Sequence, residues 1–270
     1  MAKRPLYVAS SDWHGQIGAW TQAPANRITG DSYFALKQIV DLCIELEVPL
    51  LAAGDLLDCD RPDSSTLREI FQQIDYLKAA KLPLLFTQGQ HEKAYPAYLS
   101  LHDWPTHLHG DTASYALPGY KYLYFHGLDH HHADHLQEAL KKIPENTGVL
   151  LCHQVWSNFM GVGCEGSLEM IPHAATVITG DYHKHLKIKV TGATGQEMTV
   201  LSPGATCLQD ITEPAEHFAW VAYDDGTFES NKLKSRHVFD VGISAKPDLD
   251  AFLSSGLKGV ETVVVLARVE

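Results

Sequence analysis

The stretch Leu50–Asp58, Leu-Leu-Ala-Ala-Gly-Asp-Leu-Leu-Asp, is the part of the chain that most clearly indicates the fold. A short apolar run that stops at turn residues is typical of a fully buried strand in a parallel sheet. Gly54 lets the backbone turn where a side chain would obstruct a ligand, and Asp55 follows directly. The stretch therefore predicts a strand that delivers a carboxylate to the edge of a sheet.

Four other apolar runs end in side chains that can bind metal ions. They are Leu6–Ser10, Leu82–Thr87, Gly148–His153 and Thr176–Thr179. The metal-binding residues at their ends are Asp12 and His14, Gln90 and His91, His153, and Asp181 and His183. Ligands of open α/β sheets gather outside the carboxyl ends of the strands, so five such ends predict one shared site. The mixture of carboxylates, imidazoles and one amide suits a pair of divalent ions that share Asp55.

Helical patterns follow the first two strands. Asp31 or Ser32 is expected to cap a helix that runs to about Glu47, and a second helix is predicted over Ser64–Ala80. Two successive strand–helix units predict a parallel sheet with right-handed crossovers. A third helix is expected over Ala133–Ile143. Further strands are predicted at Ser114–Leu117, Lys121–His126, Leu186–Val190, Thr199–Leu201, His217–Tyr223, Thr227–Lys234 and Thr262–Val269.

Composition limits the class of protein. The chain has 270 residues, of which 45% are hydrophobic, and this is ample for a packed core. It has no apolar run of membrane-spanning length, and we expect a cytoplasmic protein without a membrane partner. The five cysteines are widely spaced and are expected to be reduced. The formal net charge of −12 disfavours purely electrostatic binding to nucleic acid. It does not exclude a nuclease, because metal ions bound at the active site would offset part of the negative charge and are not included in the formal net charge.

The polar strand ends resemble the signature of the calcineurin-like metallophosphoesterases, which is Asp-x-His, Gly-Asp-x-x-Asp, Gly-Asn-His-Asp/Glu, His and Gly-His-x-His. The resemblance covers about residues 6–206. Within this family the chain is most similar to the SbcD-type exonuclease subunits of bacteria and phages. That similarity rests on the segments Asp12–Gly15, Gly54–Asp58, Cys152–Gln154 and Ser202–Gly204.

The resemblance implies an α/β fold, the four-layer αββα metallophosphoesterase sandwich. We assign residues 1–237 to this domain and residues 238–270 to the start of a small α+β capping domain. The chain stops just after a valine-rich strand, which favours a truncated capping domain.

The resemblance also implies roles for individual residues. One ion is expected to be held by Asp12, His14, Asp55 and His183, and the other by Asp55, Gln90, His153 and Asp181. Gln90 stands where the family has Asn, and Asp181 stands where it has the first His of Gly-His-x-His. Both departures make the second site richer in oxygen, which favours Mn²⁺, or Mg²⁺, over Zn²⁺.

The same resemblance suggests three residues that act on the substrate. His91 is expected to protonate the leaving oxygen or to stabilise the transition state, with Glu92 orienting it. His185 is expected to touch a non-bridging phosphate oxygen, and a surface position beside Lys184 is an equal alternative. For His130–His132 a solvated turn is favoured over a metal site.

The leading hypothesis is a two-metal-dependent DNA exonuclease or endonuclease that works in double-strand-break repair with an SbcC-type ATPase subunit. The family tends to dimerise through helices like Ser64–Ala80, which makes a homodimer an expectation as well. Two alternatives stay open. One is a phosphodiesterase or phosphatase that acts on a small molecule or a phosphoprotein, and the other is a metal-deficient scaffold in which Gln90 and Asp181 have spoiled the second ion site.

Overall fold

A computed structural model describes residues 3–16, 31–109, 114–116, 123–210, 213–235, 237–243, 250–251, 254 and 263–269. The helices are α1 (Ser32–Leu46), α2 (Ser64–Ala79) and α3 (Ala133–Leu140), with short 3₁₀ turns at Tyr98–Leu101 and Leu168–Met170. The strands are β1 (Pro5–Ser10), β2 (Leu50–Ala53), β3 (Leu84–Thr87), β4 (Thr106–His107), β5 (Ser114–Ala116), β6 (Tyr124–Leu128), β7 (Val149–His153), β8 (Thr176–Gly180), β9 (Leu186–Thr191), β10 (Glu197–Ser202), β11 (His217–Tyr223), β12 (Phe228–Leu233), β13 (His237–Ile243) and β14 (Val263–Val269).

Two six-stranded sheets form the body of the protein. The first has the order β12-β11-β1-β2-β3-β4 and the second the order β5-β6-β7-β8-β10-β9. In the first sheet β1, β2, β3 and β4 run parallel, as the successive strand–helix units predict. In the second sheet β6, β7, β8 and β10 run parallel. The carboxyl ends of the parallel strands within each sheet therefore lie at one edge, where ligands gather.

Alternating side chains of the strands divide the core into layers. In β1, Val8 packs with α1 and α2 on the outer face of the first sheet. Its neighbours Tyr7 and Ala9 point the other way, into a second apolar layer that also contains Phe125 of β6 and Val149 of β7. This layer fills the space between the two sheets. Because a strand sends successive side chains to opposite faces, strands buried on both faces read as continuous apolar runs.

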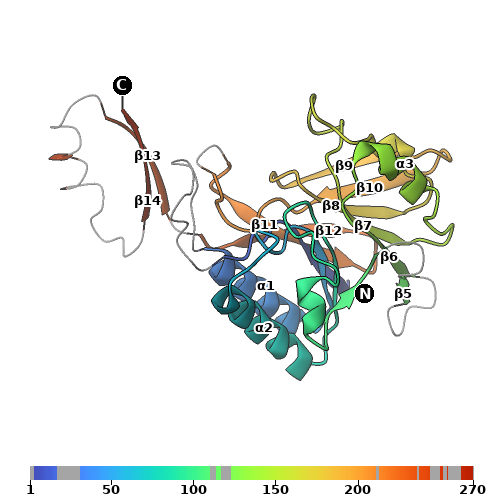
Figure 1. Cartoon of the computed structure of the whole chain (residues 1–270), viewed down its shortest axis with the longest axis horizontal. Coiled ribbons are helices and arrows are strands. Elements are labelled where there is room, and N and C mark those ends of the chain that lie inside the picture. Colours follow the sequence, from blue (N-terminus) through green and yellow to red (C-terminus); the bar gives the residue numbers. More distant parts are fainter. Residues whose placement is uncertain are drawn as a thin grey trace.

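A third apolar layer lies between the second sheet and α3. Leu150 and Cys152 of β7 pack there with Leu136 and Leu140 of α3. Figure 1 shows α1 and α2 on one side of the two sheets and α3 on the opposite side. The arrangement is the predicted αββα sandwich, with helices on the two outer faces.

The first two helices form where the apolar spacing predicts them. Leu36, Ile39 and Val40 are buried on one face of α1, and Ile70 and Ile74 on one face of α2. Asp63 caps α2 by accepting a hydrogen bond from the backbone N–H of Thr66. The predicted cap of α1 is present only in position, because Asp31 precedes the helix without a capping hydrogen bond from its side chain.

Several predicted boundaries differ from the structure. The strand predicted at Lys121–His126 is found at Tyr124–Leu128, and the third helix ends at Leu140 rather than at Ile143. The sequence also predicts a long loop over residues 15–30 and a helix over residues 249–255, and most of both segments lies outside the described residues. None of the described helices is long and apolar enough to cross a membrane.

The last strands form a separate small sheet. β13 and β14 pair in parallel from His237↔Val263 to Ile243↔Val269. Figure 1 shows this two-stranded sheet beside the sandwich rather than within it. These two strands lie within residues 238–270 except for His237, and the assignment of this segment to a capping domain stays a prediction.

Candidate metal centre

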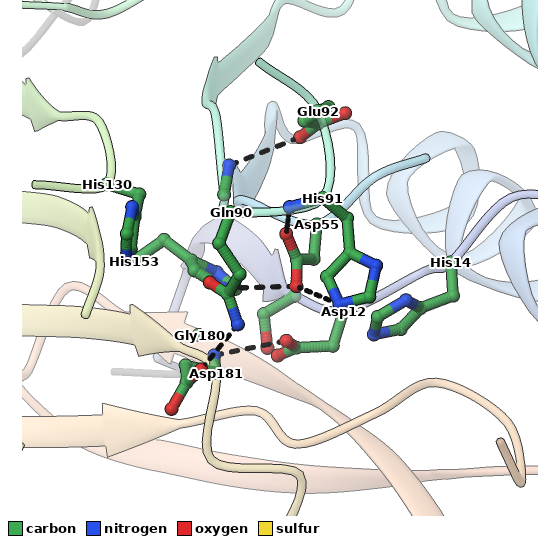
Figure 2. A network of polar contacts seen from close by, with 12 residues as sticks. Asp12, His14, Asp55, Gln90, His91, Glu92, His130, His153, Gly180 and Asp181 are labelled. Carbon is green, nitrogen blue, oxygen red and sulfur yellow. Dashed lines mark hydrogen bonds and ion pairs between the residues drawn. The ribbon is translucent and has the colours of Figure 1, made fainter. Parts of the chain in front are cut away.

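The predicted site residues converge at the carboxyl ends of strands from both sheets. Asp12 and His14 follow β1, Asp55 follows β2, and Gln90 and His91 follow β3. From the second sheet, His153 ends β7, and Asp181 and His183 follow β8. Figure 2 shows Asp12, Asp55, Gln90, His91, His153 and Asp181 turned toward one another.

The backbone is strained at four of these positions. Among the described non-glycine residues, six have a positive φ. Two of them, Glu47 and Lys81, lie just beyond the ends of α1 and α2, where such a conformation is common. The other four are Asp12, His14, Asp55 and Asp181. Residues in this conformation cluster at active sites and ligand clamps, because the surrounding structure must hold them there.

Two glycines bring the sheets close together at the site. Gly54 has a φ of 72°, and a Cβ there would lie 2.5 Å from Nδ1 of His153. A Cβ on Gly180 would lie 2.2 Å from the carbonyl oxygen of Ala53. The contact between the end of β2 and the ends of β7 and β8 therefore requires glycine at both positions.

His153 joins the two sheets and faces Asp55. Its Nδ1 donates a hydrogen bond to the carbonyl oxygen of Ala53 (2.8 Å), which leaves Nε2 directed at Asp55 Oδ2 at 3.3 Å. Burial alone would lower the pKa of His153, but the buried Asp55 carboxylate outweighs it and raises the pKa to about 10. Burial likewise opposes ionisation of Asp55, yet His153, His14 and His91 hold its pKa well below the usual range. Asp55 and His153 therefore form a buried ion pair.

His14 and His183 meet edge to edge from the two sheets. Their Nε2 atoms are 3.2 Å apart, and a cation between them would take a lone pair from each ring. Asp58 accepts from Nδ1 of His14 at 3.0 Å. Glu213 accepts from Nδ1 of His183, and this pair offsets the effect of burial and raises the pKa of His183 to about 9. Each carboxylate fixes the orientation of its histidine, as outer partners of metal-binding histidines do.

The two residues that depart from the family pattern contact each other. The side-chain amide of Gln90 donates a hydrogen bond to Asp181 Oδ1 at 2.6 Å. The backbone N–H of Asp181 donates to Asp12 Oδ1 at 3.0 Å, which ties this pair to the other half of the centre. Burial raises the pKa of Asp181, while Gln90 and His153 act in the opposite direction.

His91 lies at the open side of the centre. Its ring Nδ1 donates to the backbone carbonyl of Asp58 at 3.1 Å, which directs Nε2 toward Asp55 Oδ2 at 3.8 Å. About a third of its side chain (34%) is exposed, whereas that of Asp55 is buried. The ring of His91 is therefore partly open to solvent, whereas the carboxylate that it faces is buried.

The sequence predicts that Glu92 orients His91, but in the structure the Glu92 side chain bonds to other groups. Its carboxylate is buried and accepts hydrogen bonds from the backbone N–H groups of Leu56 (3.0 Å) and Leu57 (3.1 Å). Burial raises the pKa of Glu92 to about 8. The residue holds the turn that carries Asp55, while the orientation of His91 comes from Asp58.

The motifs and their placement match a known family. The family model for calcineurin-like phosphoesterases matches residues 7–185, which is more than half of the chain. The chain belongs to the calcineurin-like phosphoesterase family. Members of this family are dimetal phosphoesterases, and the clustered His and Asp side chains of this chain could bind metal ions.

Similar proteins within this family include DNA double-strand break repair proteins. The Mre11 proteins of Methanosarcina mazei and Methanosarcina acetivorans are both 28% identical to the chain, over 183 and 192 residues. These matches cover 59% and 63% of this chain but only 28% and 29% of the relatives. The chain therefore matches less than a third of the length of these curated proteins.

The same sandwich occurs in a solved structure of low sequence identity. The protein TT1561 of Thermus thermophilus superposes with a TM-score of 0.53 at 14% identity, covering 86% of this chain and all of that one. This likeness supports the phosphoesterase fold.

The buried side chains of the site fit bound cations. Four buried ligand atoms make no hydrogen bond in the described part of the chain: Asp12 Oδ2, Asp55 Oδ2, Gln90 Oε1 and His153 Nε2. Of these, Asp55 Oδ2 and His153 Nε2 form the ion pair at 3.3 Å described above. Three compact groups of potential ligand atoms lie here, namely Asp12/His14/His183, His14/Asp55/His91 and Asp12/Asp55/His153. Buried polar atoms without partners are costly, and coordination of a cation would satisfy them.

His185 lies apart from the centre. Its ring stacks on that of Trp220 with centroids 4.1 Å apart, and its Nδ1 donates to the carbonyl oxygen of Pro203 at 3.0 Å. Its Nε2 contacts Ser230 Oγ at 2.6 Å, so both ring nitrogens are engaged. The structure does not bring His185 together with the other predicted residues.

Glu213 contacts the site residue His183 and is not predicted from the sequence. It lies beyond the matched family segment, in the region between β10 and β11, and no motif marks it. The only signal in the sequence is its carboxylate, and its partner His183 lies 30 residues away.

Proposed function

We propose that the chain hydrolyses phosphodiester bonds of DNA with the aid of two divalent metal ions. The observation that carries the proposal is the convergence of buried ligand atoms at the family's motif positions: Asp12 Oδ2 and Gln90 Oε1 have no hydrogen bond, and Asp55 Oδ2 and His153 Nε2 face each other as a buried ion pair. The similarity to double-strand break repair proteins supports DNA as the substrate.

The ligand sets follow from the strand ends that supply them. Asp12, His14, Asp55 and His183 are proposed to hold one ion. Asp55, Gln90, His153 and Asp181 are proposed to hold the other. Because this second set contains three oxygen donors and one nitrogen donor, we propose Mn²⁺ as its metal, with Mg²⁺ as a substitute.

The protein's own groups supply the rest of the chemistry. When bound, two divalent ions lower the pKa of a water and neutralise phosphoryl oxygens. His91 is proposed to give the proton on Nε2 to the leaving oxygen, since its Nδ1 is held by Asp58 and its ring is accessible. Glu92 is a positioning residue that acts through the turn of Asp55.

The acidic surface bears on how DNA is bound. With a formal net charge of −12, the chain alone offers little electrostatic attraction to phosphates. We therefore propose that an SbcC-type ATPase partner supplies most of the DNA contacts in a repair complex. A homodimer through α2 is part of the same proposal.

Cleavage of linear duplex DNA in the presence of Mn²⁺ tests the function. The unmodified protein should cut the DNA, a chelator should stop the cutting, and Asp55→Asn should reduce it to background with the fold intact by circular dichroism. Asp60→Asn changes an exposed carboxyl a few residues away and should leave the rate unchanged, which makes it the matched control.

The substrate class is separated by a parallel assay. Turnover of a chromogenic phosphodiester without any DNA cleavage would replace the nuclease by a small-molecule phosphodiesterase. Near-normal DNA cleavage by Asp55→Asn would contradict the two-metal assignment.

A further inference from the structure

A second group of metal-binding side chains lies outside the two-metal centre. His130 and His132 precede α3, and Glu165 lies in the loop after β7. Each of the three offers one ligand atom, and these atoms lie within 4.8 Å of one another. The group shares no residue with the ligand sets proposed above.

Hydrogen bonds of both its side chain and its backbone hold Glu165 in place. Its Oε1 accepts from Nε2 of His130 at 2.6 Å, and its Oε2 accepts from the backbone N–H of Val155 at 3.1 Å. Its backbone N–H donates to the carbonyl oxygen of Val155 at 2.9 Å. The carboxylate is therefore fixed relative to the end of β7.

The two histidines are also fixed by their backbones. The N–H of His130 donates to the carbonyl oxygen of Gln88 at 2.9 Å. His132 is the N-cap residue of α3, and its carbonyl oxygen accepts from Leu136 N at 3.0 Å. The two rings meet edge to face with centroids 5.3 Å apart. All three candidate ligands thus stand on anchored backbone, as a preorganised site requires.

The hydrogen bond between His130 and Glu165 does not account for the position of the His132 ring beside them. The His130 and Glu165 side chains are largely buried, at 8% and 12% exposure. His132 is exposed, and within the described part of the chain its ring makes no hydrogen bond, although it points into the same small cluster. An ion would displace the proton that His130 Nε2 shares with Glu165, release it to solvent and engage all three side chains at once.

We propose that His130, His132 and Glu165 form a third divalent-metal site, suited to Zn²⁺. Two imidazoles and one carboxylate are a ligand set of catalytic zinc sites and of other borderline transition metals. Mg²⁺ and Ca²⁺ prefer oxygen ligands and fit this set poorly. Three protein ligands leave one position of a tetrahedral ion open, and the exposure of His132 makes that position accessible to water or an anion.

The third site adjoins the two-metal centre. Figure 2 shows His130 next to His153, and the backbone of His130 is bonded to Gln88, two residues before Gln90. An ion at this place would tie the segment before α3 to the loop that carries Glu165.

Zinc stoichiometry of the full chain tests the site. The protein is dialysed against Zn²⁺, freed of loose ions by gel filtration and analysed for bound zinc. His132→Ala and Glu165→Gln should each bind one ion fewer than the unmodified chain. His135→Ala is the control, because it removes an exposed histidine three residues away and should leave the stoichiometry unchanged.

Two further readouts keep the result clear. Asp55→Asn should bind less zinc than the unmodified chain, because it removes a ligand of the two-metal centre. The double variant Asp55→Asn/His132→Ala should bind one ion fewer than Asp55→Asn. This comparison tests the third site independently of the proposed function. With Co²⁺, the visible absorption of the unmodified chain should contain a component that Glu165→Gln lacks. Equal zinc stoichiometry in folded His132→Ala and in the unmodified chain would overturn the proposal.

Discussion

His91 is the residue best placed to exchange a proton with a substrate at the centre. Its Nδ1 is held by the carbonyl oxygen of Asp58, and its ring packs edge to face against His14 with centroids 5.0 Å apart. His91→Ala should lower the rate of phosphodiester cleavage by about 10²–10⁴-fold, the usual scale of general acid–base help. Single-turnover rates with Mn²⁺ measure this effect, and His135→Ala should behave like the unmodified chain.

The metal content of the same variant decides the role of His91. If it acts as an acid, His91→Ala keeps both ions of the centre. Loss of an ion together with activity would make His91 a ligand, a role that its place beside His14 and Asp55 also permits.

Gln90 and Asp181 should act as a unit, because the Gln90 amide donates to the Asp181 carboxylate at 2.6 Å. Gln90→Asn shortens the arm by one methylene and should break this hydrogen bond and lower activity. Asp181→His should weaken Mn²⁺ relative to Zn²⁺, following ligand softness. The double variant restores the family pattern and should recover part of the loss.

A double-mutant cycle on Mn²⁺-dependent cleavage measures this coupling. Strictly additive losses would show that the two residues act independently. That result would favour the scaffold alternative, in which the departures have spoiled the second ion site.

At the residue scale, the sequence predicts those metal-binding residues of the centre that lie at the end of a buried strand. Asp12 and Asp55 come two residues after the ends of β1 and β2, and His153 ends β7, so the strand pattern places each of them at the edge of a sheet. Glu213 escapes prediction because its contact with His183 depends on the tertiary path of a loop. His185 is misleading for a related reason, since its stacking on Trp220 comes from a strand that lies far away in the sequence.

At the element scale, α2 depends on a cap that can be tested. The Asp63 carboxylate accepts hydrogen bonds from the side chain of Ser65 and from the backbone N–H of Thr66. Asp63→Ala should lower the free energy of unfolding by about 1 kcal/mol, the usual cost of losing a cap. Urea denaturation measures it, and Glu45→Ala on the exposed face of α1 should change stability by less than about 0.5 kcal/mol.

The same cap predicts a pH dependence. The hydrogen bonds from Ser65 and Thr66 lower the pKa of Asp63 from 3.8 to about 2. A lowered pKa in the folded state gives stability that is fully present above pH 3.8 and is lost as the pH falls toward 2. The difference between Asp63→Ala and the unmodified chain should therefore shrink in that range, and a constant difference would show that ionisation is irrelevant to the cap.

Elements with strong apolar periodicity are predicted well, whereas their ends are not. α1 and α2 appear within one residue of their predicted ends because a wide apolar stripe packs on the first sheet. β6 ends at Leu128, two residues beyond its predicted end, because its pairing with β7 continues to Leu128↔Cys152. Pairing register depends on the neighbouring strand, which local sequence does not reveal.

At the scale of the whole molecule, the sandwich follows from strands that are apolar on both faces. Leu50 and Ala52 face the helices, while Leu51 and Ala53 face the second sheet. Local patterns predict such doubly buried strands and their parallel pairing. The meeting of two sheets at a single site required the family resemblance, because no local pattern brings His153 against Asp55.

The central claim is that both sheets together hold two divalent ions with Asp55 between them. Anomalous diffraction from crystals of the full chain soaked in Mn²⁺ tests it most directly. We predict two peaks that both contact Asp55, one beside Asp12, His14 and His183 and the other beside Gln90, His153 and Asp181. A single peak, or none, at these side chains would contradict the account.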